Sequence, residues 1–424
     1  MSPSADYPRR VRIVTQYFWP EPGAPSVRYA AIVRTLVSLG VDVTVLTGIP
    51  SYPTGRVAPG YAALRPMTEE HDGARIQRLP LLPYGGQNKW LRLANHGSFA
   101  TSVLLSAMRA HPVDLVITES PPLPLALGGA AIARRGRAPM VLYVADAWPD
   151  VAIAMGALRE GWLADRLRSL ESAAYRAAWR ITVPTDGLYA KIAAHPAGGA
   201  AKTLLLPNGV DHGIFHPVDP AECGEERAAL GDLADRALFI YAGTIGHAQA
   251  LDTILDCAIL LRDQPEIGFA LLGDGPERAR LEARASAAGL GNVRFLGAVP
   301  PEQVARYLAL ARASIAPLRD VALFEATRPA KILPSLACAR PVVFCGRGEM
   351  AALLERERAG LVVPPEDATA LAAAVRSLAA APAEARAMGE RGRAWALREF
   401  DFTALVRRWF ESLSAALPRR ARGS

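Results

Sequence analysis

Short apolar runs alternate with segments of helical spacing along the whole chain. In the first half, apolar runs predict buried strands at 11–15, 41–46, 115–118, 140–144, 180–183 and 204–206. Between them, apolar residues recur at helical spacing in 27–39, 89–108, 123–134 and 166–178. The segment 51–84 is rich in Pro, Gly and Tyr, which predicts loops with one strand near 75–79. A strand, a helix and a second strand in succession form a βαβ unit and imply a parallel sheet.

The second half repeats this pattern after a turn at Pro207–Asp211. Strands are predicted at 238–242, 268–272, 293–296, 314–317 and 342–345, and helices at 251–262, 278–288, 301–311 and 331–339. The tail from 368 to 417 is helical in pattern. A chain of 424 residues is expected to form about two or three domains. We therefore predict an α/β protein of two doubly wound domains, 1–207 and 208–395, and a C-terminal helix, 396–424, that packs back on the first domain.

The composition is that of a globular protein, with 51% hydrophobic and 21% charged residues. No apolar run approaches the ~18 residues of a membrane span. The N-terminus lacks the apolar segment of a secretory signal. The four cysteines are far apart with no C-x-x-C spacing, which favours reduced thiols over disulfides or zinc. These features predict a cytoplasmic location.

The excess of positive over negative charge lies entirely in the first half. Residues 1–207 contain 22 Lys and Arg against 14 Asp and Glu, a balance of +8, and the remainder has a balance of −1. A basic half favours nucleic acid, an anionic membrane surface or an anionic substrate, and charge alone does not distinguish them. In the helix 89–108, Lys89, Trp90 and Arg92 lie in the first turns, which fits a lipid headgroup interface. A core helix with a solvated basic edge is the other interpretation.

Three loops at strand or helix ends are candidate ligand sites. Gly243–Gly246 follows a strand and precedes a helical pattern, so its amides could approach a phosphate, although an ordinary strand-to-helix turn has the same sequence. Gly23 and Ala24, at the entrance of the first helix, could receive a diphosphate or sugar, or lie in a plain surface loop. Asp146 follows the strand 140–144 at the sheet edge where ligands bind in open α/β folds, but it could equally be a helix N-cap.

Eight motifs in order are similar to those of one enzyme family. They are Tyr17–Pro25, Thr47–Gly55, Asp146–Asp150, Pro207–Asp211 with Phe215 and Pro217, Tyr241–Gly246, Gly273–Arg278, Phe295–Gly297 and Pro329–Pro341. Over nearly its whole length, the chain resembles bacterial glycosyltransferases of family 4, and particularly the branch that builds surface polysaccharides and lipid-linked saccharides. The resemblance implies the GT-B fold, in which two Rossmann-like domains face each other across a cleft.

The resemblance also implies a reaction and its participants. It implies transfer of a hexosyl or N-acetylhexosaminyl group from a nucleotide-sugar donor, with retention at the anomeric carbon, to a lipid-linked or polysaccharide acceptor. The acceptor would bind the first domain and the donor the second, and the basic first half would face an anionic membrane. No nucleic acid partner is expected. The sequence has no D-x-D motif, so we expect neither a metal nor another cofactor.

Residue roles follow from the same resemblance. Lys331, with Arg328 beside it, is expected to bind the diphosphate, and Asp146 to face the reacting sugar. Glu325 is expected near the donor sugar. The acceptor is expected to bind the loop that contains Glu21, Gly23 and Ala24. The donor set is Gly243, Thr244, Gly246, Gly273, Asp274, Gly275, Phe295, Leu296, Glu325 and Lys331; the acceptor loop set is Glu21, Gly23 and Ala24.

The sequence departs from the family at two glutamate positions. The family's second glutamate, which contacts the ribose, aligns with Pro334, and its first aligns with Ala326, next to Glu325. Thr244 replaces a usual arginine. Losing a charged contact to the ribose costs about 1.5–3 kcal/mol of affinity. A degenerate partner protein without activity therefore stays an alternative, as does a sugar-nucleotide epimerase on the same fold, although the paired carboxylates and histidine of an epimerase cannot be assembled here.

Overall fold

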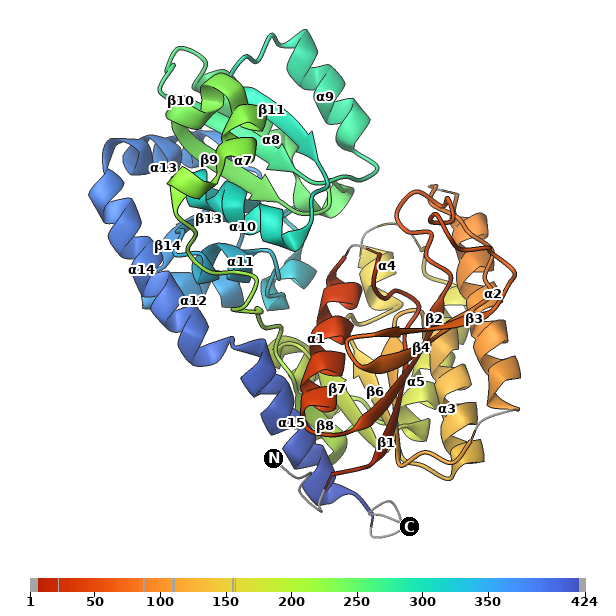
Figure 1. Ribbon diagram of the computed structural model, residues 1–424. Helices are drawn as coiled ribbons and strands as arrows, with labels where there is room; N and C mark the ends of the chain where they lie inside the picture. The colour runs from red at the N-terminus through yellow and green to blue at the C-terminus, as the bar shows by residue number, and fades with distance from the viewer. Residues whose placement is uncertain are drawn as a thin grey trace. The chain divides into compact units, whose positions relative to one another are not determined.

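The chain forms two compact units, which we describe separately. The computed structural model describes residues 7–21, 23–86, 88–108, 111–154, 156 and 158–418, without the side chains of Ala24, Lys89, Ala154, Leu323 and Ala326. One unit comprises Met1–Pro207 with Thr403–Ser424, and the other comprises Asn208–Phe402 (Figure 1). The chain therefore enters the second unit at Asn208 and returns to the first unit at Thr403.

The first unit is built on an eight-stranded sheet in the order β3-β4-β2-β1-β5-β6-β7-β8. Its strands are β1 (Arg10–Val14), β2 (Asp42–Gly48), β3 (Met67–His71), β4 (Ala74–Leu79), β5 (Leu115–Ser120), β6 (Met140–Val144), β7 (Arg180–Val183) and β8 (Thr203–Leu205). All neighbouring strands are parallel except β3 and β4, which confirms the predicted parallel sheet. The prediction of a single strand within 51–84 is wrong. The segment also contains β3, an edge strand with the sequence MTEEH. This sequence is polar, so it lacks the apolar pattern that predicts a buried strand.

Helices cover this sheet. They are α1 (Ala24–Ser38), α2 (Lys89–Ala107), α3 (Leu123–Gly136), α4 (Asp150–Ala154), α5 (Trp162–Ala177), α6 (Asp186–Ala194) and α15 (Phe402–Ala416), with a 3₁₀ turn, η1 (Ala200–Lys202). The sequence pattern did not predict α6. The last helix packs into the first unit by burying Trp409, Phe410 and Leu413, and the Trp409 indole donates a hydrogen bond of 3.0 Å to the Thr182 hydroxyl.

The second unit contains a six-stranded, fully parallel sheet in the order β11-β10-β9-β12-β13-β14. Its strands are β9 (Ala237–Ala242), β10 (Ile267–Leu272), β11 (Val293–Gly297), β12 (Ala313–Pro317), β13 (Val342–Cys345) and β14 (Gly360–Val363). Its helices are α7 (Gly224–Leu230), α8 (Asp252–Leu260), α9 (Arg278–Ala287), α10 (Pro301–Leu310), α11 (Ile332–Ala337), α12 (Glu349–Glu357), α13 (Ala368–Ala380) and α14 (Pro382–Glu399). The short 3₁₀ turns are η2 (Pro220–Glu222), η3 (Gly231–Asp235), η4 (His247–Gln249) and η5 (Ala322–Ala326). The elements α7, α12 and β14 were not predicted.

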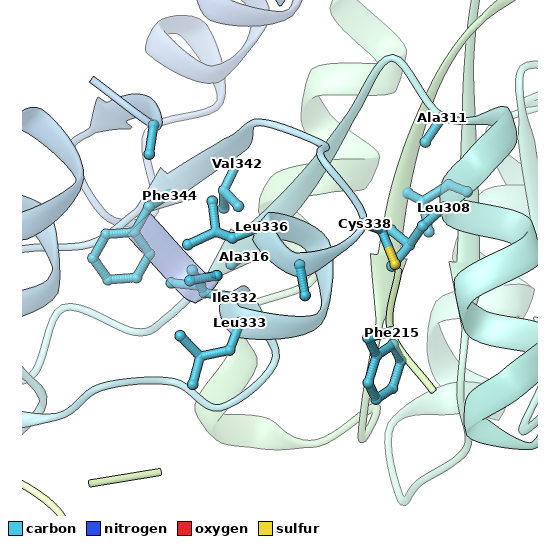
Figure 2. Packing of buried hydrophobic residues seen from close by; sticks show 14 of the residues in the cluster. Phe215, Leu308, Ala311, Ala316, Ile332, Leu333, Leu336, Cys338, Val342 and Phe344 are labelled. Atoms are coloured by element: carbon cyan, nitrogen blue, oxygen red, sulfur yellow. The ribbon is translucent and has the colours of Figure 1, made fainter. Parts of the chain in front are cut away.

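Both faces of the second sheet are buried, which explains its continuous apolar strands. In β9, Leu238 and Ile240 belong to the core on one face, while Phe239 and Tyr241 belong to the core on the other. The short helix α11 is anchored in the first of these cores by Ile332, Leu333 and Leu336 (Figure 2). This anchoring fixes the position of Lys331, which immediately precedes the helix.

Two further features concern the loops and helices as a whole. The helix predicted after the loop Gly243–Gly246 is confirmed as α8, and η4 and the left-handed residue Ala250 (φ 45°) lie between the loop and this helix. Of the helices in the described ranges, none combines the length and apolarity needed to cross a membrane.

Candidate functional site

Each sheet has one point at which its strand order reverses, and ligands of open α/β sheets bind at the carboxyl ends of the strands there. In the first unit the reversal lies between β1 and β5, and in the second unit it lies between β9 and β12. The candidate residues of each unit lie at or near these strand ends.

In the second unit, the two glycine loops after β9 and β10 lie against each other. The Gly243 amide donates to Leu272 O at 2.9 Å, and the Ile245 amide donates to Asp274 O at 2.9 Å. A Cβ atom on Gly273, which has φ +144°, would lie 1.8 Å from Gly243 O, so only glycine permits this approach. The two hydrogen bonds between the loops use the amides of Gly243 and Ile245. The amides of Thr244 and Gly246 donate to no acceptor within the described chain. These two amides are available to an anion.

The Lys331 ammonium lies beside these loops. It donates to the Tyr241 hydroxyl at 3.0 Å and lies 4.7 Å from the centre of the Tyr241 ring. The Tyr241 hydroxyl in turn donates to Thr244 O at 2.6 Å, so Tyr241 joins the lysine to the loop. A Cβ on Gly243 would lie 3.5 Å from Lys331 Cε. The glycine at 243 therefore leaves room for the lysine side chain.

Lys331 is partly buried and forms no ion pair with a carboxylate of the described residues. Because burial disfavours a charged ammonium, it lowers the pKa of Lys331 to about 7. An anion placed next to Nζ would restore the charged form. A partly buried ammonium beside amides that have no acceptor is suited to binding a phosphate group.

Arg328 is not free to act in the same way. Its Nε donates to Glu349 Oε1 at 2.8 Å, and its Nη2 also contacts that oxygen. Glu349 is the first residue of α12, a helix that was not predicted, so this pair could not be expected from the sequence. Arg328 would have to exchange this carboxylate for a phosphate.

The other donor candidates of the second unit occupy different surroundings. Glu325 is exposed in η5, and its backbone packs so closely on Gly348 that a Cβ there would lie 2.0 Å from Glu325 O. In β11, Phe295 and Leu296 are partly buried and pack against opposite cores. Thr244 and Asp274 are exposed. The Asp274 carboxylate accepts a bond of 2.8 Å from the Gly275 amide, which stabilises the turn.

Pro334, which the family resemblance predicts to replace a ribose-binding glutamate, lies inside α11. Its carbonyl accepts from the Cys338 amide at 3.0 Å. As a proline, it presents neither a carboxylate nor an amide hydrogen.

In the first unit, a buried ionic cluster lies at the reversal point. Glu119 at the end of β5 is 2% exposed, accepts from the Thr15 hydroxyl at 2.6 Å and lies 3.4 Å from Arg28 Nη1. The Arg28 guanidinium lies 4.5 Å from the centre of the Tyr143 ring. Burial raises the pKa of Glu119 to about 7; Arg28 and Thr15 oppose this rise, and the negative charge of Asp146 adds to it.

Asp146 itself is exposed, beyond the end of β6. The interpretation of Asp146 as a helix N-cap is wrong, because the next helix, α4, begins at Asp150. Its charge acts on the pKa of Glu119, of Arg28 and of Tyr143, so it lies close to the buried cluster. An exposed carboxylate above a buried ion pair, at the ligand-binding edge of the sheet, stays a candidate for contact with a substrate.

The residues of the predicted acceptor loop have structural contacts. Glu21 is 7% exposed, and its Oε1 accepts from the amides of Ser51 and Tyr52 at 2.8 Å each, while Oε2 is buried without a hydrogen-bond partner. Burial raises the pKa of Glu21 to about 7. Gly23, with φ 123°, is the N-cap of α1. Ala24 is the first residue of α1, but its side chain lies outside what the structure describes.

Sequence reasoning missed Tyr241, Glu349, Glu119, Arg28 and Thr15. Tyr241 lies in an apolar run and is indistinguishable there from a core residue. Glu119 had a detectable signal, because it is a lone acidic residue at the end of an apolar strand, where the sequence reads ITES. Among the residues that the structure describes, no group of three His, Cys, Asp or Glu side chains is placed to hold a metal ion.

Two family models match the chain, one in each half. Residues 23–209 match the glycosyl transferase 4-like domain, and residues 236–381 match the glycosyl transferases group 1. The chain is 31% identical over 270 residues to the putative colanic acid biosynthesis glycosyl transferase WcaI of Escherichia coli K12, a match that covers 62% of this chain and 65% of WcaI. It is 28% identical over 179 residues to O-antigen chain mannosyltransferase C of Escherichia coli, covering 42% of this chain and 45% of the relative. The matches thus span less than two thirds of these relatives' lengths.

Solved structures show the fold. Sucrose-phosphate synthase from Thermosynechococcus elongatus superposes with a TM-score of 0.75 at 20% identity, covering 96% of this chain and all of that one. Anabaena Alr3699/HepE, solved in complex with UDP-glucose, superposes with a TM-score of 0.72 at 17% identity, covering 96% and 99% of the two chains. Together with the two parallel sheets, these likenesses confirm the GT-B fold.

Proposed function

We propose that the chain, which belongs to the group 1 glycosyltransferases of family 4, transfers a sugar from a nucleotide-sugar donor to an acceptor in the synthesis of a cell-surface glycan. The proposed transfer retains the configuration of the anomeric carbon. The observation that carries this proposal is the Lys331 ammonium, held 3.0 Å from the Tyr241 hydroxyl next to the two free loop amides.

The donor is argued from the chemistry of that site. As the bond between the anomeric carbon and the diphosphate breaks, negative charge develops on the leaving phosphate oxygens. A fixed ammonium and the amides of Thr244 and Gly246 stabilise this charge, and glycine at 243 and 273 lets the backbone approach. The UDP-glucose of the HepE complex supports a nucleoside diphosphate as the leaving group. Phe295 and Leu296 are then assigned to the region of the base or ribose.

The acceptor is proposed from the relatives. WcaI and O-antigen mannosyltransferase C are named for colanic acid and O-antigen, which are surface glycans. We assign a lipid-linked or polysaccharide acceptor to the first unit, near Asp146 and the loop of Glu21 and Gly23. The location would be cytoplasmic and peripheral at the inner membrane face, where the balance of +8 in residues 1–207 favours anionic lipid.

The proposal is tested by incubating the protein with a panel of UDP-, GDP- and dTDP-sugars and undecaprenyl-linked acceptors. We expect one donor to be consumed, and the anomeric configuration of the product to match that of the donor by NMR. Failure to bind, hydrolyse or transfer any donor, in calorimetry and in the transfer assay, would overturn it.

Pro334 favours one second candidate, a partner protein without its own activity. Because proline removes the carboxylate expected at the ribose, we predict that Pro334→Glu raises the affinity for the donor nucleotide about tenfold or more if the chain is a transferase with a weakened site. Isothermal calorimetry measures this change, and Pro334→Ala is the control. Unchanged affinity in the Glu variant would point to a different arrangement at the ribose.

A further inference from the structure

A series of hydrogen-bonded side chains leads from the loop before α2 to a histidine on this helix. Asn95 Nδ2 donates to Leu82 O at 2.6 Å, and Gln16 Nε2 donates to Asn95 Oδ1 at 2.7 Å. The other polar atom of Gln16, Oε1, lies 2.8 Å from His96 Nδ1. Gln16 is 1% exposed and Asn95 is 6% exposed, so water hardly competes for these bonds. We call Asn95, Gln16 and His96 the amide relay.

The chemistry of the amide relay fixes the tautomer of His96. A carbonyl oxygen can only accept, so the Asn95 atom that faces Leu82 O must be the amide nitrogen. Asn95 Oδ1 must then accept from Gln16 Nε2, and Gln16 Oε1 must accept from His96 Nδ1. The proton of the neutral imidazole therefore lies on Nδ1, and Nε2 has a lone pair that can only accept a hydrogen bond.

This lone pair has no partner within the described part of the protein. None of the described residues donates to His96 Nε2, and this nitrogen is not buried, so solvent reaches it. Burial of the ring lowers the pKa of His96 to about 4, and the positive charge of Arg92 adds to this effect. The ring is therefore neutral at pH 7. It is too weak a base to remove a proton from a hydroxyl group, but it can accept a hydrogen bond.

His96 lies near the ligand-binding edge of the first sheet. Gln16 follows the end of β1 by two residues, at the reversal between β1 and β5. The next residue, Tyr17, pairs with Tyr52, and their ring centres are 5.1 Å apart. The charge of Arg92, one helical turn before His96, acts on the pKa of all three rings, so these four side chains lie close together.

These surroundings fit a neutral sugar better than an ion. A ligand must offer a hydrogen to Nε2, which an oxyanion lacks, and Arg92 would repel an ammonium group. A sugar hydroxyl has this hydrogen, and the rings of Tyr17 and Tyr52 offer apolar surface to the C–H face of a sugar. The candidate acceptor loop is adjacent, because Glu21 Oε1 accepts from the Tyr52 amide at 2.8 Å.

We propose that His96 Nε2 accepts a hydrogen bond from a hydroxyl group of the acceptor sugar, while Gln16 and Asn95 hold the ring in the tautomer that this bond requires. The identity of this sugar as the acceptor rests on the proposed function, but the tautomer and the binding of saccharides can be measured without any transfer. A sugar that lacks the hydroxyl group would leave Nε2 without a donor, so His96 contributes to the choice of acceptor.

NMR of the full-length protein with ¹⁵N-labelled histidine tests the tautomer. The resonances of His96 are assigned as those that disappear in His96→Gln. We expect a proton on Nδ1 and none on Nε2 at pH 7, and no protonation of Nε2 at pH 5.5, since the pKa is about 4. A proton on Nε2 at pH 7, in the other tautomer or in an imidazolium, would overturn the proposal.

Titration with saccharides tests the binding role. The probes are the methyl glycosides of glucose, mannose, galactose and N-acetylglucosamine, added to millimolar concentration. We expect at least one of them to shift the His96 Nε2 resonance. His96→Phe should weaken its binding about tenfold, because the variant loses one hydrogen bond to the ligand. His96→Gln should restore much of the affinity, since its amide can donate to Gln16 while its oxygen accepts from the sugar.

The control is His111→Phe, at an exposed histidine outside the amide relay, which should bind the saccharide as the wild type does. An unmoved Nε2 resonance with every probe, or equal affinity in His96→Phe and wild type, would overturn the proposal. Calorimetry with UDP and GDP on the same samples reports the donor site. Nucleotide binding without a saccharide at His96 would refute this proposal and leave the transferase standing. A saccharide at His96 without nucleotide binding would support this proposal and contradict the transferase.

Discussion

Replacing Lys331 by Met removes the ammonium but keeps the length and most of the apolar contacts of the side chain. Burial lowers the pKa of Lys331 to about 7 from its ordinary value of 10.5, which corresponds to at most about 5 kcal/mol against the charged form at ~1.4 kcal/mol per pKa step. Because the side chain is only partly buried, we expect the free-energy penalty on the charged form to be about 2–3 kcal/mol. Lys331→Met should therefore be more stable to urea at pH 6 and bind nucleotide less well.

The sign of the pH dependence follows from proton counting. Between pH 7 and 10.5 the unfolded chain holds a proton on Lys331 that the folded chain lacks, so the stability of the wild type rises with pH in this interval. Below pH 7 both states are protonated, and the whole penalty is present. We expect the stability advantage of Lys331→Met to be largest near pH 6 and to disappear by about pH 10.5.

Nucleotide binding should show the opposite preference. A diphosphate next to Nζ favours the ammonium, so the affinity of the wild type for UDP or GDP should fall about tenfold per pH unit above 7. At pH 6.5, Lys331→Met should lose one to two orders of magnitude in affinity and most of this pH dependence. Calorimetry at pH 6.5 and 9 measures both, with Lys191→Met, at a surface lysine paired with Asp150, as the control. Equal affinity of wild type and variant, or a wild type whose affinity ignores pH, would refute the reasoning.

Three further substitutions are informative. Gly273→Ala would place a Cβ 1.8 Å from Gly243 O, so we expect a loss of about 3 kcal/mol or more, seen as a lower Tm, whereas Gly291→Ala, in open space, should leave the Tm unchanged. Asp146→Asn should lower turnover more than donor affinity if its carboxylate faces the reacting sugar, and equal losses in kinetics and calorimetry would assign it to folding. Glu119→Gln removes a carboxyl group whose pKa is raised to about 7 from an ordinary 4.5. In the wild type, this raised pKa makes the folded protein less stable as the pH rises from 4.5 to 7. We therefore expect the variant to show a smaller fall in Tm between pH 5 and 8 than the wild type. An undiminished fall would show that Glu119 ionises normally.

The sequence predicted the elements that are buried on both sides. Strands such as β6 and β9 are covered by helices on both faces, so every position is apolar and the run is visible without knowledge of the fold. The strand β3 escaped prediction because, at the sheet edge, its side chains meet water. The segment β14 has only four residues, and its neighbour α12 begins after a glycine with φ 83° that gives no capping signal in the sequence.

The candidate site was less accessible to sequence reasoning than the fold. Lys331 was identifiable because lysine is rare in this chain and because its segment resembles a family motif. Its partner Tyr241 belongs to a core-facing position of β9, and only the fold brings it to the lysine, 90 residues later in the sequence. Likewise, the Arg328–Glu349 pair joins a loop to a helix that the pattern missed, so the engagement of Arg328 could not be foreseen.

The discontinuous first unit has a consequence for protein synthesis. Its sheet is complete once residue 205 has been made, but Trp409, Phe410 and Leu413 of α15 join its interior some 200 residues later. During translation, the nascent first unit must wait without its final helix while the whole second unit emerges from the ribosome. A chain that ends near residue 400 would lose little of the second unit. It would, however, expose the apolar surface of the first unit that α15 covers, and this surface would promote aggregation.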